Sequence, residues 1–152
     1  MAGFRDFIWA GVILCFFGCK GSSHLIVEDF SSKSRIDKGN LILSLKNVSE
    51  RKMLLPNPRD VYVQRLVSDE WVDVPFVPCK CGAPCSPAIP YTVFEGQTTE
   101  VTWNMYSRTC NGQDATEELQ ESGTYRMKID YQLIEYGTIV KSTFQWVQFD
   151  LP

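Results

Sequence analysis

The sequence predicts an all-β domain, a sandwich of seven to eight antiparallel strands, and three observations lead to this prediction. Apolar and polar residues alternate with a period of two along much of the chain, a pattern typical of strands with one buried face. Short turn sequences separate these segments. Aromatic residues make up 12% of the chain, which supplies material for a packed core and argues against disorder.

The first strands are short and separated by turn or proline sequences. Proline cannot donate to a central ladder, which excludes Pro56–Pro58 and Pro75–Pro90 from central strands. Asp114–Glu121 is the one segment expected to form a helical turn. The strands expected before residue 110 are Leu25–Phe30, a segment with Leu41, Leu43 and Leu45 on one face, Val61–Val67, Trp71–Phe76, Tyr91–Phe94 and Thr98–Met105.

The clearest strand covers Gly123–Tyr136, where every second residue is apolar and the residues between are polar. A return strand is expected at Ile139–Asp150. Its alternation changes phase between Trp146 and Val147, so we expect a bulge or a strand that is buried on both faces. The residues expected to face the core from the first of these strands are Tyr125, Met127, Ile129, Tyr131 and Leu133.

A local motif at the start of that strand narrows the fold. Glu121-Ser122-Gly123-Thr124-Tyr125 resembles the segment that opens the penultimate strand of immunoglobulin-like domains, where the tyrosine hydroxyl bonds to upstream backbone. Met127 stands where antibody domains carry a core cysteine. We therefore predict an immunoglobulin-like sandwich over residues 25–152 without the inter-sheet disulfide. The alternative is that Tyr125 is only a core aromatic.

The amino-terminal segment has the features of an export signal. Arg5 precedes Phe7–Phe17, eleven residues that are apolar or glycine. A bilayer span needs about 20 apolar residues, whereas a cleaved signal has an apolar region of roughly 7–15 residues. Residues 1–18 are therefore interpreted as a signal peptide.

Phe16-Phe17-Gly18-Cys19 resembles the lipobox of bacterial lipoproteins. The resemblance implies cleavage before Cys19, a diacylglyceryl group on its sulfur and a fatty acid such as palmitate on the new amino terminus. Residues 19–24, including His24, would form a lipidated tether. Lys20 is not the aspartate that retains such proteins in the inner membrane, so the outer membrane is favoured. The alternatives are an ordinary signal peptide cleaved nearby or an uncleaved anchor.

Four cysteines remain after Cys19: Cys79, Cys81, Cys85 and Cys110. An exported chain meets an oxidising compartment, where paired thiols become disulfides. A bond between Cys79 and Cys81 would close a strained ring, so one of them is expected to pair with Cys110 and the other with Cys85. The alternative is a site for Zn²⁺ or Cu(I) in which the same four thiolates are the ligands.

The region from Leu41 to Tyr131 is similar to bacterial intracellular proteinase inhibitor (BsuPI-like) domains, which are also immunoglobulin-like sandwiches. The chain looks closer still to cysteine-containing lipoproteins of Gram-negative bacteria. The first resemblance is carried by Leu41-x-Leu-x-Leu45-x-Asn47, by Phe94-Glu95-Gly96-Gln97 before Val101-Thr102-Trp103, and by Ser122-Gly123-Thr124-Tyr125. These residues frame the fold, so the resemblance implies little about inhibition.

Composition disfavours several functions. The net charge is −3 without a basic cluster, so no nucleic-acid partner is expected. The only histidine, His24, lies in the tether, which leaves no base for a Ser-His-Asp arrangement. The pairs Asp69-Glu70 and Glu117-Glu118 are interpreted as solvated turns. Trp71, Trp103 and Trp146 are interpreted as core, with a sugar or peptide groove as the alternative, and Asn47-Val48-Ser49 matches a glycosylation sequon.

The sequence thus predicts a non-enzymatic lipoprotein of the cell envelope that needs no cofactor. It would contact the membrane through its lipid anchor and present a disulfide-stiffened loop to an unidentified envelope protein. One alternative is a proteinase inhibitor that acts through the loop Cys79–Pro90. The other is a carrier of copper or zinc that uses the four thiolates.

Overall fold

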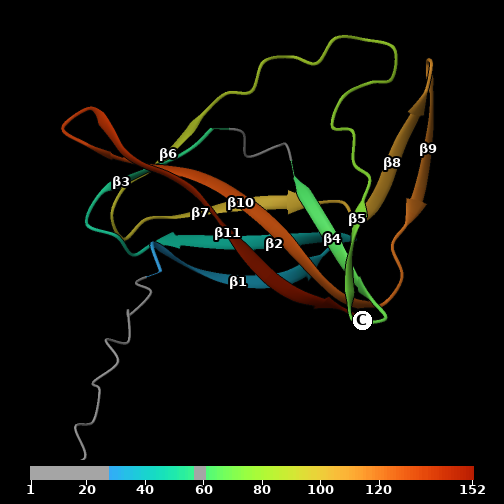
Figure 1. Cartoon of the computed structure of the whole chain (residues 1–152), viewed down its shortest axis with the longest axis horizontal. Coiled ribbons are helices and arrows are strands. Elements are labelled where there is room, and N and C mark those ends of the chain that lie inside the picture. The colour runs from blue at the N-terminus through green and yellow to red at the C-terminus, as the bar shows by residue number, and fades with distance from the viewer. Residues whose placement is uncertain (1–27, 57–60) are drawn as a thin grey trace, which may run out of the picture.

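Two antiparallel sheets face each other in the computed structural model, which describes residues 28–56 and 61–152 (Figure 1). This is the immunoglobulin-like sandwich that the sequence predicts. A separate two-stranded hairpin stands beside the sandwich. The eleven strands in the described residues are β1 (Phe30–Asp37), β2 (Asn40–Asn47), β3 (Lys52–Leu55), β4 (Tyr62–Val67), β5 (Glu70–Val74), β6 (Tyr91–Val93), β7 (Thr98–Trp103), β8 (Tyr106–Asn111), β9 (Asp114–Leu119), β10 (Gly123–Glu135) and β11 (Thr138–Leu151).

The smaller sheet has the order β1-β2-β7, with β2 in its centre. The predicted alternation of β2 is confirmed, because Leu41, Leu43 and Leu45 are buried. β1 pairs with β2 along its whole length, from Phe30 opposite Asn47 to Asp37 opposite Asn40. As a polar edge strand, β1 buries only Phe30, which explains why its alternation is not visible in the sequence.

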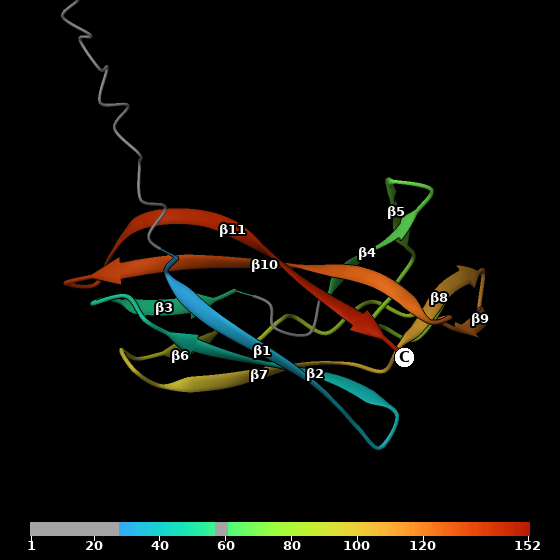
Figure 2. The same cartoon turned by 90° about the horizontal axis from the view of Figure 1, so that it is seen from below.

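The larger sheet is built around β10. β11 pairs with one side of β10 over almost its full length, while β3 and β4 lie end to end along the other side. β6 and β5 extend the sheet beyond β3 and β4. The β10–β11 register shifts between Leu133 and Ile134, near the hairpin turn, but it is continuous at Trp146 and Val147, where the sequence suggests a bulge. The change of phase there arises because Trp146 and the buried Val147 lie on opposite faces of β11. Figure 2 shows β10 and β11 in one layer and β1, β2 and β7 in the other.

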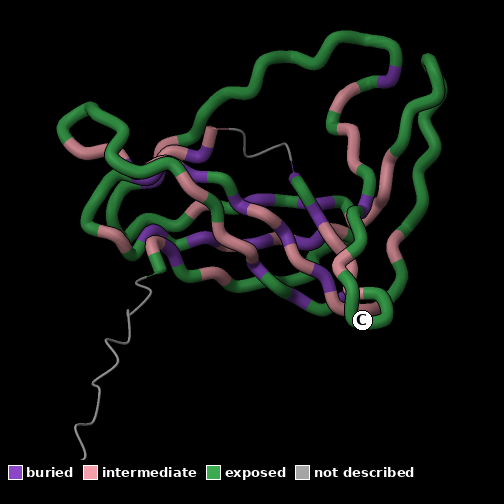
Figure 3. The backbone as a smooth tube through the Cα atoms, in the orientation of Figure 1, coloured by how far each residue is buried: buried purple, intermediate pink, exposed green. Residues whose placement is uncertain are grey.

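The core lies between these layers and contains every apolar residue predicted for the inner face of β10. Trp103 from the smaller sheet packs against Tyr125, with ring centroids 5.8 Å apart. Phe149 stacks on Tyr125 at 6.1 Å, so the three rings join both sheets. Figure 3 shows buried residues alternating with mostly half-buried ones along β2 and β10, whereas the β8–β9 hairpin is mostly exposed.

The structure corrects three details of the sequence prediction. The first described strand begins at Phe30 rather than ending there, and Leu25–Val27 lies outside the described residues. Asp114–Glu121 forms no helical turn, because Asp114–Leu119 is strand β9 and pairs with β8. β3, β8 and β9 lie where no strand is predicted, which raises the count above eight.

Asp29 fixes the start of the domain to the larger sheet. Its carboxylate accepts hydrogen bonds from the Tyr131 hydroxyl, at 2.6 Å, and from the Lys141 ammonium. Burial raises the pKa of Asp29, but these two bonds, with the charges of Lys141 and Arg51, outweigh it and lower the pKa below the usual 3.8. Burial and the bond to Asp29 raise the pKa of Tyr131.

This arrangement predicts a stability change at acidic pH. Because folding lowers the pKa of Asp29, the ionised carboxylate stabilises the folded state. This stabilisation is complete at pH values above the unfolded pKa of 3.8, and it is lost as the pH falls through the lower pKa of the folded state. We expect Asp29→Asn to be less stable than the parent near neutral pH. The difference between them should shrink toward acidic pH, as measured by urea unfolding at each pH. A difference that stays constant across this range would contradict the role of Asp29.

Candidate functional site

The two disulfides lie at one end of the sandwich and select one of the two pairings left open by the sequence. Cys79 pairs with Cys85 inside the loop between β5 and β6, with Cα atoms 5.3 Å apart. Cys81 pairs with Cys110 of β8, with Cα atoms 5.5 Å apart. All four sulfur atoms are bonded, so none of them is a thiolate. Among residues 28–56 and 61–152, no group of three or more histidine, cysteine or acidic residues is placed to hold a metal ion.

The loop of residues 75–90 contains no strand and is exposed over most of its length. The Ala83 N–H donates to the Lys80 carbonyl and forms a tight turn inside the disulfide-closed ring. Cys81 is buried, but Ile89 is 77% exposed near the end of the loop. The disulfides therefore hold an irregular segment that shows side chains to solvent.

The β8–β9 hairpin is the partner of this loop. A methyl group placed on Gly82, which has φ +74°, would approach the Gln113 side chain at the hairpin turn to 2.8 Å. Farther from the tip, in the middle of β8, the Arg108 N–H donates to the Pro75 carbonyl at 2.7 Å. Together with the Cys81–Cys110 bond, these contacts fasten β8 and the hairpin tip to the loop.

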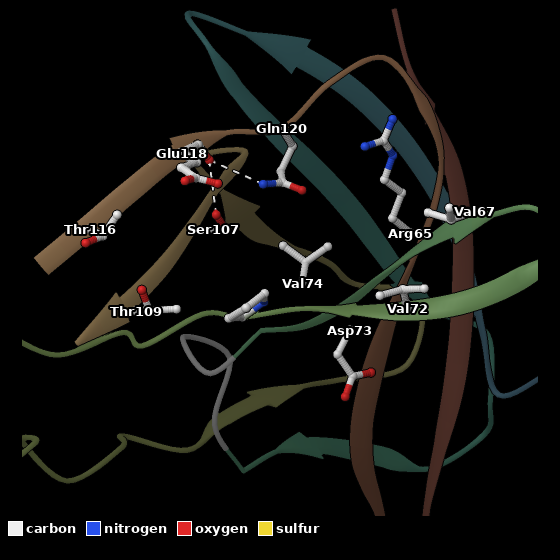
Figure 4. A pocket seen from close by; sticks show the side chains of 11 residues that line it. Arg65, Val67, Val72, Asp73, Val74, Ser107, Thr109, Thr116, Glu118 and Gln120 are labelled. Carbon is white, nitrogen blue, oxygen red and sulfur yellow. Dashed lines mark hydrogen bonds between the residues drawn. The ribbon is translucent and has the colours of Figure 1, made fainter. Parts of the chain in front are cut away.

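A groove of about 410 Å³ opens between the hairpin and the β4–β5 ribbon (Figure 4). Val67 and Val72 are half-exposed along it, and Val74 is buried. Arg65 lies at one side, where its guanidinium pairs with Glu121 at 2.9 Å. The lining residues are Arg65, Val67, Val72, Asp73, Val74 and Pro75 on one side, and Ser107, Thr109, Thr116, Glu118 and Gln120 on the other.

The groove thus combines aliphatic side chains with hydroxyl and amide groups. Ser107 already donates to the Glu118 carbonyl at 3.4 Å, and Gln120 donates to the same carbonyl at 3.3 Å. Valine side chains next to hydroxyl groups fit an extended polypeptide, which has small apolar side chains and regularly spaced amides. Nothing in the sequence indicates this groove, because β8 and β9 were not predicted as strands.

The tyrosine corner holds the sandwich at the same end. The Tyr125 hydroxyl donates to the Glu121 carbonyl at 2.7 Å, as the motif implies. Arg65 donates to the neighbouring Ser122 carbonyl at 3.2 Å and lies over the Tyr125 ring. Because Glu121 directly follows the last lining residue of the hairpin, Gln120, the corner ties the groove to the core.

The tryptophans predicted as core occupy two different environments. Trp103 is in the core, and its indole N–H donates to the Tyr106 carbonyl at 3.1 Å. Trp71 and Trp146 instead lie on the outer face of the larger sheet, where their ring centroids are 4.3 and 4.2 Å from the Arg126 guanidinium carbon. Arg126 also donates two hydrogen bonds to the side-chain amide oxygen of Gln64, so this stack is a self-contained brace across the sheet.

The remaining candidate residues do not form a catalytic cluster. Asp69 lies in the β4–β5 turn, and Glu117 and Glu118 are exposed on β9, so neither acidic pair is enclosed. Asn47 is fully buried and donates to two backbone carbonyls, which makes it a structural residue rather than a sugar acceptor. Cys19 and His24 lie outside the described residues.

Compared with known proteins, the chain matches no protein-family profile and no curated sequence. The class of the domain therefore follows from the fold and its cross-links. It is an immunoglobulin-like β-sandwich with two disulfides, in which the β8–β9 hairpin and the β4–β5 ribbon border a groove. The described residues contain no helix long and apolar enough to cross a membrane.

Proposed function

We propose that the protein is a non-catalytic lipoprotein of the cell envelope that binds another envelope protein through its disulfide-braced end. Cys19 would hold it at the outer membrane, as the lipobox resemblance implies. The observation that supports binding is the Cys81–Cys110 bond, which ties the exposed loop to β8, a strand of the hairpin that forms one side of the groove. Loops held on a rigid scaffold commonly carry binding functions.

The two disulfides reduce the conformational entropy that the loop loses when it binds a partner. An irregular loop loses conformational freedom when it docks, and each immobilised flexible side chain costs about 0.5–1.5 kcal/mol. The two disulfides and several prolines restrict the loop before any partner arrives. This favours recognition of a protein surface or an extended segment over catalysis.

The orientation of the domain supports the same interpretation. β1 begins at one end of the sandwich, and the β8–β9 hairpin stands at the other end in both views (Figures 1 and 2). A lipid at Cys19 would therefore lie nearer the first end. The groove and the loop would point away from that membrane, where a partner can reach them.

Photo-cross-linking in living cells tests this proposal. A photoreactive amino acid is placed at Val72 in the groove, at Ile89 in the loop, or at Lys33, an exposed residue of the polar strand β1 that serves as control. We expect one protein to be captured from positions 72 and 89 but not from 33. Equal capture at all three positions, or none at 72 and 89, would contradict the proposal.

The exposure of Ile89 also favours a second candidate, a proteinase inhibitor. Ile89 is 77% exposed beside Pro90 in a disulfide-braced loop, a form in which a peptide bond can enter a protease cleft without being flexible. The test is inhibition of a broad protease panel by the purified domain. Inhibition at micromolar concentration that is lost in Ile89→Gly would support it, and no inhibition of any protease would remove it.

A further inference from the structure

Exposed apolar side chains gather on the turns at the end of the sandwich opposite the disulfides. They lie on the β2–β3 turn, the β6–β7 turn and the β10–β11 hairpin, which meet at the same end in both views (Figures 1 and 2). Single exposed apolar residues are ordinary, but a group of them marks an interaction surface. We name the following group the apolar end patch: Val48, Phe94, Tyr136, Ile139 and Val140.

The hairpin turn places Tyr136 at the tip of this patch. Glu135 pairs directly with Thr138, so the turn consists of only Tyr136 and Gly137, both with positive φ, as tight two-residue hairpins require. Tyr136 is 100% exposed. A tyrosine with backbone angles in the left-handed region is unusual. Its presence at the most exposed position of the patch indicates that its side chain contacts another surface.

One ion pair and one cation–π contact connect the turns at this end of the sandwich. Arg51, directly before β3, pairs with Glu135 at 3.1 Å. The Lys52 ammonium lies over the Phe94 ring, 5.3 Å from its centre. These contacts join the three turns, so the apolar end patch is one braced surface rather than three separate loops.

The short segment between Cys19 and Glu28 would keep this surface near the membrane that holds the lipid. Glu28 is nine positions after Cys19, a segment that spans at most about 30 Å when fully extended. β11 has 14 residues and a length of about 45 Å, so the sandwich is longer than this tether. Because β1 begins near the apolar end patch, a lipid on Cys19 would keep this end close to the bilayer (Figure 2).

The charges near the patch favour apolar contact over attraction to anionic lipid. Arg51 is paired with Glu135, and Lys141 is paired with Asp29. Lys52 lies over Phe94, and the acidic residues Glu50 and Glu95 flank the same turns. Without a free basic cluster, the patch suits the zwitterionic surface of a phospholipid bilayer.

We propose that the apolar end patch rests in the headgroup region of the bilayer that anchors the chain, with Tyr136 deepest. This inference rests on the proposed lipid anchor at Cys19. Tyrosine suits this position because its ring enters the apolar boundary while its hydroxyl stays among the headgroups. The contact would fix the orientation of the sandwich and hold the groove at the opposite end away from the membrane.

Depth-dependent quenching tests this contact. The lipidated Tyr136→Trp variant is placed in phosphatidylcholine vesicles whose acyl chains carry bromine, and its fluorescence is compared with that of the unchanged chain. Apolar groups of interfacial segments lie about 5–10 Å into the boundary, so we expect the tryptophan at 136 to be quenched about two-fold or more. Asn111→Trp, at the exposed tip of the β8–β9 hairpin, is the matched control and should not be quenched.

The controls separate this inference from the lipid anchor. In a second preparation, Cys19 is replaced by a histidine tag that binds nickel-chelating lipid. Quenching at 136 in this preparation, together with no uptake of labelled palmitate by cells that express the chain with Cys19 intact, would support the membrane contact and refute the anchor. Palmitate uptake with equal quenching at 136 and 111 would refute the contact alone. An emission shift of the tryptophan at 136 that depends on protein concentration in the absence of vesicles would show that the patch binds a second copy of the chain. That result would also refute the membrane contact.

Discussion

Replacing Cys81 and Cys110 together by serine is expected to lower the free energy of unfolding by about 3–4 kcal/mol. The bond links two cysteines that are 29 positions apart and so closes a loop. Without it, the unfolded chain regains the conformational entropy of that loop. In the folded state, the same change releases the β8–β9 hairpin from the loop. We therefore expect faster amide hydrogen exchange in β8 and β9, with exchange in β10 least affected.

The Cys79–Cys85 bond provides the matched control, because it closes only six positions and lies wholly inside the loop. Its removal is expected to cost about 2 kcal/mol by the same loop-entropy argument. Exchange in β8 and β9 should then change little. Equal losses of stability in the two double variants, or unchanged exchange in β8 after loss of Cys81–Cys110, would contradict the bracing role.

Replacing Asn47 by alanine is expected to lower the free energy of unfolding by about 2–4 kcal/mol, because each buried group left unpaired costs about 1–3 kcal/mol. The Asn47 side chain is 0% exposed and donates to the carbonyls of Arg51 and Val93, at 2.7 and 3.0 Å. Its oxygen accepts bonds from the N–H and the hydroxyl of Ser49. The side chain thereby ties the β2–β3 turn to β6.

Ser49→Ala distinguishes this structural role from glycosylation. It destroys the sequon as completely as Asn47→Ala does, but it removes only one hydroxyl and leaves the two bonds to backbone carbonyls intact. Urea unfolding of both variants should therefore show the larger loss for Asn47→Ala. Equal losses would mean that the buried amide contributes little.

The sandwich could be predicted because its central strands each bury one face. In β10 the alternation from Tyr125 to Leu133 is unbroken, and every apolar member is buried. The tyrosine corner could be predicted for a different reason, since its donor and acceptor are four residues apart and belong to one local motif. The disulfides could be limited to two pairings because one alternative is strained.

The β8–β9 hairpin could not be predicted from local sequence. Asp114–Leu119 contains good helix formers, and all its residues are exposed, so no alternation marks it as a strand. Its conformation comes from pairing with β8, which the Cys81–Cys110 bond and the contact of Arg108 with Pro75 hold in place. The groove depends on this hairpin and was missed with it.

The outer brace was missed because its members come from three separate strands. Trp71, Arg126 and Trp146 belong to β5, β10 and β11, and no local pattern links them. The alternation of apolar and polar residues correctly predicts that Arg126 faces away from the core. It could not show that two tryptophans from different strands both contact this guanidinium.

The central claim is that one cysteine carries lipid while four others form two disulfides. It is tested most directly by the intact mass of the protein extracted from cell membranes. We predict the mass of a chain that begins at Cys19 with a diacylglyceryl and a fatty acyl group, and a gain of four hydrogen atoms on reduction, two for each disulfide. A chain without lipid at Cys19, or a mass unchanged by reduction, would contradict it.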